Sequence, residues 1–417
     1  MSTTRIPALL ILTSTFLAAG ANGISMVAFP WLVLQRTGSA VDASIVAGAA
    51  TLPLLLATLI AGTAVDFVGR RRVAMLSDAL SALSVAAIPV LVIAFGTDVL
   101  STAVLAALAA LGAFFDPAGA TARESMLPEA GGRAGWSLDH TNSIYEAVFN
   151  LAYITGPGVG GLLIATIGGV NTMWATATVF TLSIVAAGLL RLEGAGRPDA
   201  DTRPDGVVSG IVEGLRFVWG ERVLRTLALV SLAVTGLYLP MESVLFPKYF
   251  TDRNEPAQLG WVLMALAIGG LIGALSWTVL SRFANRRTTV LVAVLTLGVA
   301  SIAISFLPPL PVILALAALI GLVYGPIGPI YNSVMQTRTP QHLRGRVVGV
   351  MTSMAYAAGP IGFMLAGPLV DAFGLKVTFL VLAVPILIIA VVCPWVSALR
   401  ELDAGSEAAP PTMSAWP

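Results

Sequence analysis

The sequence predicts an all-α integral membrane protein with twelve transmembrane helices, arranged as two six-helix halves with both termini in the cytoplasm. Hydrophobic residues make up 57% of the 417 positions and charged residues only 11%, which leaves too little polar surface for a water-soluble globule. Apolar stretches of about 20 residues, the length that crosses a bilayer, recur along the chain. Basic residues fall almost entirely on one side of the predicted membrane.

Twelve apolar stretches are predicted to span the membrane. In chain order they cover residues 8–33, 43–65, 73–95, 100–122, 138–164, 172–191, 223–248, 258–281, 288–307, 310–334, 346–372 and 377–399. The first stretch is too long for a signal peptide and has no small-residue cleavage site behind it, so we expect it to be retained as a helix.

Arginine placement sets the predicted orientation. With the N-terminus inside, 19 of the 23 Lys and Arg residues lie in cytoplasmic segments, and the exceptions are Arg36, Lys248, Arg253 and Lys376. This is the positive-inside pattern of multi-pass proteins. We therefore expect a multi-pass protein of the inner, or plasma, membrane.

The longest polar interval divides the chain into domains. We expect an N-terminal half over residues 1–192, a linker over 193–222, a C-terminal half over 223–400 and a disordered tail over 401–417. Within the linker, an apolar stripe predicts an amphipathic helix that lies on the inner leaflet. The stripe consists of Val207, Val208, Ile211, Leu215 and Val218. A linker that only tethers the halves remains equally open.

Several function classes lack their sequence signals. The chain has one cysteine, Cys393, inside the last span, which gives neither a disulfide framework nor a thiolate metal site and predicts a buried small side chain. It has no histidine-rich cluster, no Gly-x-Ser-x-Gly elbow and no phosphate loop, so we expect no catalytic residues, no metal and no ATP-driven step. A net charge of +1 and the lack of a basic tract argue against nucleic acid as a partner.

The two halves repeat a common pattern. FFDPAGATARESMLPE leads to a span with GPGVGG in the first half, and YGPIGPIYNSVMQTRTP leads to a span with GPIGFMLAG in the second. A parallel repeat of this kind predicts a pseudo-two-fold axis along the membrane normal and a central cavity between the halves.

A loop motif carries the first family resemblance. The residues Gly62, Asp66, Gly69, Arg70 and Arg71 between spans two and three match the Gly-x-x-x-Asp-Arg-x-Gly-Arg-Arg pattern, except that Phe67 replaces the arginine. This pattern resembles the loop signature of the major facilitator superfamily. The resemblance implies that Asp66 holds the positive end of the eleventh helix, near Gly345 and Arg346, in the outward-open state. Three arginines that only fix the topology remain the alternative.

A glycine motif in the fifth span narrows the resemblance. Gly156, Pro157, Gly160 and Gly161 are similar to the motif of drug:proton antiporters within that superfamily, although helix packing alone would also favour these residues. The segments EGLRFVWGERVLRTL and YLPMESVLFPKYF resemble the Tap-type family of mycobacterial multidrug efflux pumps. The fourth span, however, lacks the inward arginine of other drug antiporters, and we expect Arg123 only at its cytoplasmic end.

The resemblance implies a transporter rather than an enzyme. Its partners would be protons, membrane lipids and amphiphilic drugs of the tetracycline and aminoglycoside types, exported by a monomer that rocks one half against the other. The proton gradient would be the energy source, and no cofactor is expected. Export or flipping of an endogenous lipid or a siderophore uses the same fold and remains open.

Three acidic residues lie inside predicted spans, where we expect no cation. They are Asp116, Glu146 and Glu242. A carboxylate buried without a cation favours its protonated form, which makes each a candidate for proton coupling. Glu146 shares a helical stripe with Asn142, Asn150 and Tyr153. For each acid, a structural hydrogen bond to a neighbouring helix is the alternative, and Asp116 could simply cap the break at Pro117.

Aromatic and amide side chains on the inner spans are candidates for the substrate cavity, because such groups suit amphiphilic cations of varied shape. They are Asn22, Ser25, Phe29, Asn150, Tyr153, Tyr238, Tyr324, Tyr331, Asn332 and Tyr356. Each could equally belong to the helix-packing core. Asp78, early in span three, is expected to join the network at the inner face.

Overall fold

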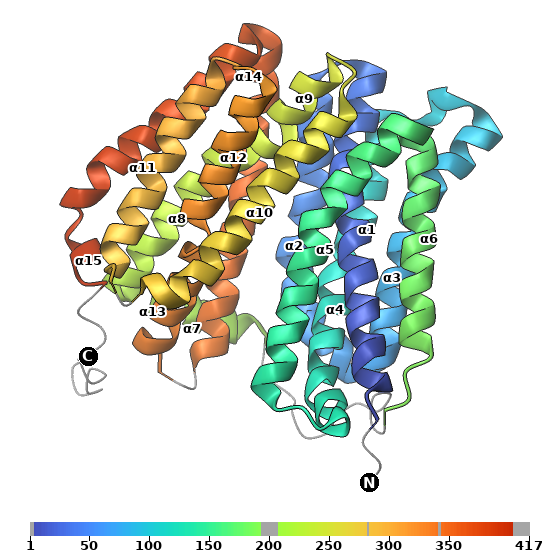
Figure 1. The fold of residues 1–417 in the computed structure, drawn as a ribbon, viewed down its shortest axis with the longest axis horizontal. Helices are drawn as coiled ribbons and strands as arrows, with labels where there is room; N and C mark the ends of the chain where they lie inside the picture. Colours follow the sequence, from blue (N-terminus) through green and yellow to red (C-terminus); the bar gives the residue numbers. More distant parts are fainter. Residues whose placement is uncertain (1–3, 193–206, 282, 341–342, 403–417) are drawn as a thin grey trace. The chain divides into compact units, whose positions relative to one another are not determined.

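The computed structural model describes residues 4–192, 207–281, 283–340 and 343–402, and these residues form helices without a β-strand (Figure 1). The helices are α1 (Ile6–Thr37), α2 (Ala40–Val68), α3 (Arg70–Phe95), α4 (Thr102–Ala134), α5 (Leu138–Ile167), α6 (Gly169–Gly188), α7 (Val207–Gly220), α8 (Arg222–Pro240), α9 (Phe246–Thr251), α10 (Pro256–Leu280), α11 (Arg286–Ser305), α12 (Leu310–Tyr324), α13 (Ile327–Arg338), α14 (Arg344–Val392) and α15 (Ser397–Arg400).

Ten helical stretches among the described residues are long and apolar enough to cross a membrane. The prediction of an all-α, multi-pass membrane protein is therefore confirmed. α2 is a further apolar helix, and α14 breaks at Gly374 (φ 79°), between the last two predicted spans. The count of twelve spans and the cytoplasmic position of the termini stay predictions.

Serine and glycine mark where several helices begin and end. The hydroxyls of Ser39, Ser101 and Ser137 accept hydrogen bonds from backbone N–H groups in the first turns of α2, α4 and α5. Gly38 and Gly135 follow α1 and α4 with φ of 64° and 73°, a left-handed conformation that closes a helix and favours glycine. The helix limits thus follow from local sequence.

The chain forms two compact units. Unit 1 comprises Met1–Arg203, Leu239–Met264 and Gly359–Leu375, and unit 2 comprises Pro204–Tyr238, Ala265–Ala358 and Lys376–Pro417. In unit 1, α1 packs on α5 and α6, while α4 packs on α2 and α3. In unit 2, α10 and α12 lie so close that a Cβ added at Gly321 would approach the Gly270 nitrogen to 2.6 Å.

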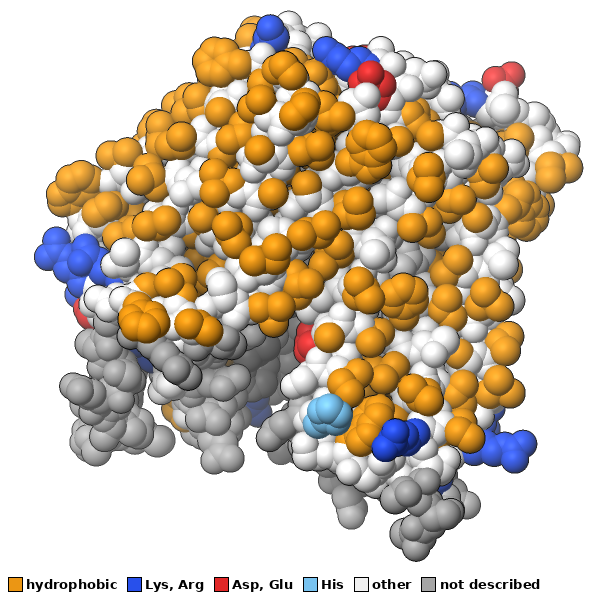
Figure 2. All heavy atoms as spheres, viewed as in Figure 1, with side chains coloured by type: hydrophobic (Ala, Val, Ile, Leu, Met, Phe, Trp, Pro, Cys, Tyr) orange, Lys and Arg blue, Asp and Glu red, His pale blue; other side chains and the backbone are white. Residues whose placement is uncertain are grey.

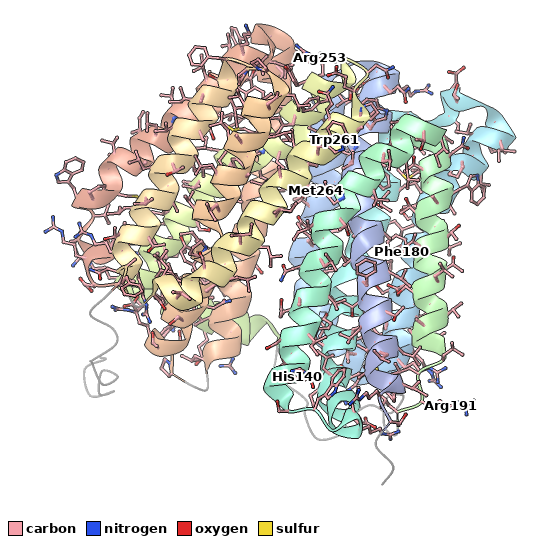
Figure 3. The ribbon with its side chains drawn as sticks, in the orientation of Figure 1. His140, Phe180, Arg191, Arg253, Trp261 and Met264 are labelled. Carbon is pink, nitrogen blue, oxygen red and sulfur yellow. The ribbon has the colours of Figure 1, made fainter. Side chains whose placement is uncertain are left out.

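Basic and polar side chains lie at both ends of unit 1 (Figure 3). Figure 3 shows His140 and Arg191 at its lower end and Arg253 at its upper end. Hydrophobic side chains cover much of the flank between them in Figure 2. Among the exposed apolar side chains of unit 1 are Leu162 of α5 and Leu182 of α6, which are 55% and 51% exposed. An exposed apolar flank between polar ends is typical of a surface that faces lipid.

Serines of α3 bind backbone carbonyl groups of α4. Ser77 Oγ donates to the carbonyl oxygen of Phe115 at 2.7 Å, and Ser81 and Ser84 donate to the carbonyl oxygens of Gly112 and Leu108, earlier in α4. Gly119 makes room for this approach, because a Cβ there would lie 2.5 Å from Ser77 Oγ. The hydroxyls thus satisfy polar groups within the bundle, as an apolar surrounding requires.

A buried ion pair joins the helices of unit 1. Arg123 Nη1 lies 3.0 Å from both carboxylate oxygens of Asp78, and the two side chains are only 5% and 2% exposed. Ser183 Oγ of α6 donates to Asp78 Oδ2 at 2.6 Å, and Ser14 Oγ of α1 lies 2.9 Å from Ser183 Oγ. Four helices, α1, α3, α4 and α6, therefore meet at one polar cluster.

This cluster corrects one expectation from the sequence. The prediction that no arginine lies deep inside a span was wrong, because α4 continues to Ala134 and encloses Arg123 rather than ending at residue 122. Asp78 accordingly lies inside the bundle as the partner of Arg123.

Removing one member of this pair should destabilise the protein strongly. We expect Asp78→Asn to lower the free energy of unfolding by roughly 3–5 kcal/mol, because it leaves the Arg123 guanidinium buried without a counter-charge. The double variant Asp78→Asn/Arg123→Gln should recover most of that loss. Equilibrium unfolding in mixed micelles measures both.

The exposed pair Arg36–Asp98 provides the control, since its N–O distance is 3.5 Å and Asp98 is fully exposed. Asp98→Asn should leave stability almost unchanged. Equal effects of Asp78→Asn and Asp98→Asn would contradict the structural importance of the buried pair.

Candidate functional site

The polar stripe of α5 is not buried inside unit 1. Asn142 and Glu146 are exposed and Tyr153 is 45% exposed, whereas Tyr145, to one side of this stripe, is only 3% exposed. The side-chain amide of Asn150 donates to the backbone carbonyl oxygen of Glu146 at 2.8 Å. Asn150 therefore does not bind the Glu146 carboxylate. A charged side chain on an apolar span is stable only where it contacts water or another part of a protein. We therefore expect this stripe to face away from lipid.

α4 brings a second carboxylate to this region. Glu124 is exposed, accepts a hydrogen bond from Tyr145 Oη at 3.5 Å and interacts electrostatically with Glu146. Glu124 was not predicted as a functional residue, because the predicted fourth span ended at residue 122, although the helical pattern continues through ARESMLPEA.

Asp116 is held by a polar partner and lies near a cation. Asn22 Nδ2 of α1 donates to Asp116 Oδ1 at 2.6 Å. Arg123 and Asp78 both interact electrostatically with Asp116, and Arg123 Nη2 lies 3.5 Å from where a Cβ of Gly119 would be. The guanidinium thus extends along α4 towards Asp116, and the expectation of a carboxylate without a nearby cation was wrong here.

Glu242 lies in a distorted segment between α8 and α9. Pro240 is followed by a π-helical turn, Met241–Leu245, which contacts α1 and α2 within unit 1. Glu242 is half-buried, and no ion pair or hydrogen bond of its side chain is present among the described residues. This acid is therefore the one that best fits the prediction of a carboxylate without a cation.

The glycine motif of α5 forms a tight junction with α1. A Cβ at Gly156 would lie 2.8 Å from Gly23 Cα, and one at Gly160 would lie 3.1 Å from Ile24 Cα. Distances this short mean that the two backbones touch. Close packing is thus a real role of these glycines.

The same motif also meets α10 in unit 1. A Cβ at Gly161 would lie 2.5 Å from the Pro256 carbonyl oxygen, and one at Gly260 would lie 2.6 Å from the Pro157 carbonyl oxygen. Met264, labelled on α10 in Figure 3, covers Gly158. The motif therefore packs against helices on both sides.

A further contact lies at the upper end of unit 1, where α14 meets the start of α2. Asp371 Oδ1 accepts a hydrogen bond from the Ala40 backbone N–H at 3.2 Å, and Ser39 Oγ donates to Asp371 Oδ2 at 3.3 Å. Gly367 permits this approach, because a Cβ there would lie 2.6 Å from Ser44 Oγ. A carboxylate at a helix N-terminus is stabilised by the helix dipole.

A repeated spacing in the sequence accompanies this contact. Gly367, Asp371 and Gly374 have the same spacing, Gly-x-x-x-Asp-x-x-Gly, as Gly62, Asp66 and Gly69. Both patterns end at a glycine with positive φ, 79° at Gly374 and 96° at Gly69. The two ends of the protein thus carry related motifs.

The gating motif at the other end is only partly described. The surroundings of Gly62, Gly345 and the Asp66 side chain lie outside the described part of the structure, so the contact of Asp66 with the eleventh span stays a prediction. Arg71 donates to the Gly188 carbonyl oxygen at the end of α6. Arg346 forms an ion pair with Glu213 of α7.

The predicted cavity residues divide between the units. Asn22, Ser25, Phe29, Asn150 and Tyr153 belong to unit 1, and Tyr238, Tyr324, Tyr331, Asn332 and Tyr356 belong to unit 2. Tyr324 is hydrogen-bonded to Thr235 and Tyr331 to Ser231, so both tyrosines bind hydroxyl groups of α8. The side chain of Tyr356 lies outside the described part.

Comparison with known proteins identifies the family to which this architecture belongs. Residues 11–363 match the family model of the Major Facilitator Superfamily. The chain is 68% identical to the multidrug efflux pump Tap of Mycolicibacterium fortuitum, over 97% of this chain and 99% of that protein. It is 64% identical to the multidrug efflux pump Tap of Mycobacterium tuberculosis strain H37Rv, over 97% and 96% of the two chains.

Solved structures agree on the fold. A crystal structure of the nucleoside transporter NupG superposes with a TM-score of 0.73 over 93% of this chain and 98% of that one, at 12% identity. The chain therefore belongs to the Major Facilitator Superfamily of membrane transporters.

Proposed function

We propose that this protein is a proton-coupled exporter of amphiphilic drugs, including tetracycline- and aminoglycoside-type compounds, that works by alternating access. The observation that carries the proposal is the exposed carboxylate of Glu146 on an apolar helix, beside Asn142 and Tyr153. Such a stripe needs an aqueous cavity. The high identity to two proteins named multidrug efflux pumps supports drugs as the cargo.

Protons would be carried by the three acids in the spans. Glu146 is exposed and interacts electrostatically with Glu124, a second carboxylate on the neighbouring helix α4. Asp116 is bonded to Asn22 and lies near Arg123, which suits a group that responds to the arrangement of α1 and α4. Glu242 lies in a π-helical turn, a distortion often found at functional sites.

Alternating access requires contacts that form at one end and break when that end opens. At the upper end of unit 1, Asp371 on the α2 N-terminus and the glycine contacts of α5 with α10 are contacts of this kind. We propose that Asp66 acts in the same way at the other end, on the start of the eleventh span. Small residues and helix-end charges can separate without leaving a buried unpaired charge.

The substrate would bind to the tyrosines and amides predicted from the sequence. Tyr324 and Tyr331 of unit 2 and Tyr153 and Asn150 of unit 1 provide π-faces and hydrogen-bonding groups. Aromatic faces attract cations and pack on apolar rings without demanding one shape. Broad drug recognition follows from such a lining.

Drug accumulation tests the proposed function. Cells that produce the protein should accumulate less tetracycline than control cells, and a protonophore should abolish the difference. Export that persists after the gradient collapses would contradict proton coupling. Export of a lipid or siderophore but of no drug would contradict the proposed substrates.

Glu146→Gln should abolish gradient-driven export, because the amide keeps the size of the side chain but cannot release a proton. The rate of tetracycline uptake into inverted vesicles with an imposed pH gradient should fall to that of empty vesicles. Asp116→Asn should cause a weaker defect. Asn142→Asp, on the same stripe of α5 as Glu146, is the control for a general loss of folding. Wild-type transport by Glu146→Gln would exclude this residue from proton coupling.

Glu242→Gln separates substrate binding from proton transfer. If Glu242 contacts cationic substrates, the variant should lose aminoglycoside export more than export of neutral drugs, since a lone carboxylate in low dielectric attracts a cation strongly. If it carries protons, export of both classes should fall together. Near-normal export of both classes would leave Glu242 as a structural residue.

Asp371→Asn should weaken the closure of the upper end. Loss of a carboxylate at a helix N-terminus costs about 0.5–1 kcal/mol, so the closed population should fall about two- to fivefold relative to the open one. Spin labels at Thr37 and Phe373, both exposed in unit 1, report the change as a longer distance in double electron–electron resonance. An unchanged distance distribution would contradict a role of Asp371 in closing this end.

A further inference from the structure

The linker helix α7 is amphipathic and uses only part of its surface in contacts. Its 14 residues extend about 21 Å, too short for the roughly 30 Å hydrocarbon core. One face packs within unit 2: Val218 is 0% exposed, and a Cβ at Gly214 would lie 2.9 Å from the Arg346 carbonyl oxygen. α7 is thus a fixed part of unit 2.

Another face of α7 is apolar and exposed. Val212, Leu215 and Trp219 are 50%, 43% and 48% exposed, and their spacing of three and four residues places them on one side of the helix. The stripe predicted from the sequence included Val218, but the protein itself covers that residue. The surface left for a partner is therefore the face of Val212, Leu215 and Trp219.

Contacts at the ends of three spans fix α7 at the level of the membrane surface. Arg346, the partner of Glu213, lies just before the apolar stretch of α14 that starts at residue 349. Glu221, which follows α7, pairs at 3.2 Å with Arg338, just beyond the apolar stretch that ends at residue 335. The next helix, α8, enters its apolar stretch at once.

The acidic and basic residues in and next to α7 differ in their ion-pair partners. Both acids, Glu213 and Glu221, pair with arginines of unit 2. Arg216 is exposed and forms no ion pair with any residue that the structure describes. Arg225 donates to the Trp219 carbonyl oxygen, and none of the described acids pairs with it. The charged groups beside the apolar face that have no ion-pair partner among the described residues, Arg216 and Arg225, are therefore positive.

We propose that α7 lies in the membrane interface, with Val212, Leu215 and Trp219 at the acyl boundary and with Arg216 and Arg225 on the phosphates of anionic lipids. Tryptophan prefers this depth, and arginine recognises phosphate through its planar fork. An amphipathic helix with basic residues beside its apolar face binds anionic membranes in this way. The linker thereby ties unit 2 to the lipid surface.

Accessibility of spin labels tests the position of the apolar face. The full chain with Cys393→Ala carries one label at position 215, 219 or 220 in nanodiscs of phosphatidylcholine and phosphatidylglycerol. Labels at 215 and 219 should be more accessible to oxygen than to a water-soluble nickel chelate, and the label at the exposed Gly220 should show the reverse. Equal nickel accessibility at all three positions would overturn the proposal, as would dipolar broadening between copies, which indicates a second chain on this face.

Lipid selectivity tests the two arginines. Spin-labelled phosphatidylglycerol should associate with the wild-type protein in preference to spin-labelled phosphatidylcholine. Each of Arg216→Gln and Arg225→Gln should reduce this preference roughly fivefold, the effect of one basic residue at an anionic surface. Arg216→Lys keeps the charge and should retain most of the preference. An unchanged preference in the double glutamine variant would overturn the assignment of anionic lipid.

Discussion

Polar groups inside a bilayer must find partners within the protein or face water, and this constraint separates the two kinds of charge in this chain. The Asp78–Arg123 pair represents the first kind, because it is enclosed by four helices and its carboxylate also accepts a hydrogen bond from Ser183. Glu146 represents the second kind, because it is exposed on an apolar helix. The first charge stabilises the fold, and the second requires a cavity.

The same constraint is met at the junctions between helices of unit 1. The junctions of α5 with α1 and α10 consist of glycines, and the junction of α14 with α2 consists of Asp371 on a helix N-terminus. None of these contacts buries an unpaired charge when it forms or breaks. The Gly-x-x-x-Asp-x-x-Gly spacing occurs at Gly62 and again at Gly367. We therefore expect Asp66 to contact a helix N-terminus as Asp371 does.

Much of the fold could be predicted from hydropathy and from the residues that cap helices. The predicted fourth span was too short, because apolar averages fall where ARESMLPE begins, although the helix continues. That error hid Arg123 and Glu124. The face of α7 was also only partly predicted, since no sequence pattern shows that the protein itself covers Val218. The Asp371 contact depends on two segments far apart in the chain, and only the repeated spacing indicated it.

Proton movement caused by the drug tests the central claim most directly. Proteoliposomes that contain the purified protein and a pH-sensitive dye inside should change their internal pH when tetracycline is added outside, in the direction of exchange. Proteoliposomes with Glu146→Gln should show no such change while still binding the drug. Drug transport by the wild-type protein without any proton movement would contradict the account.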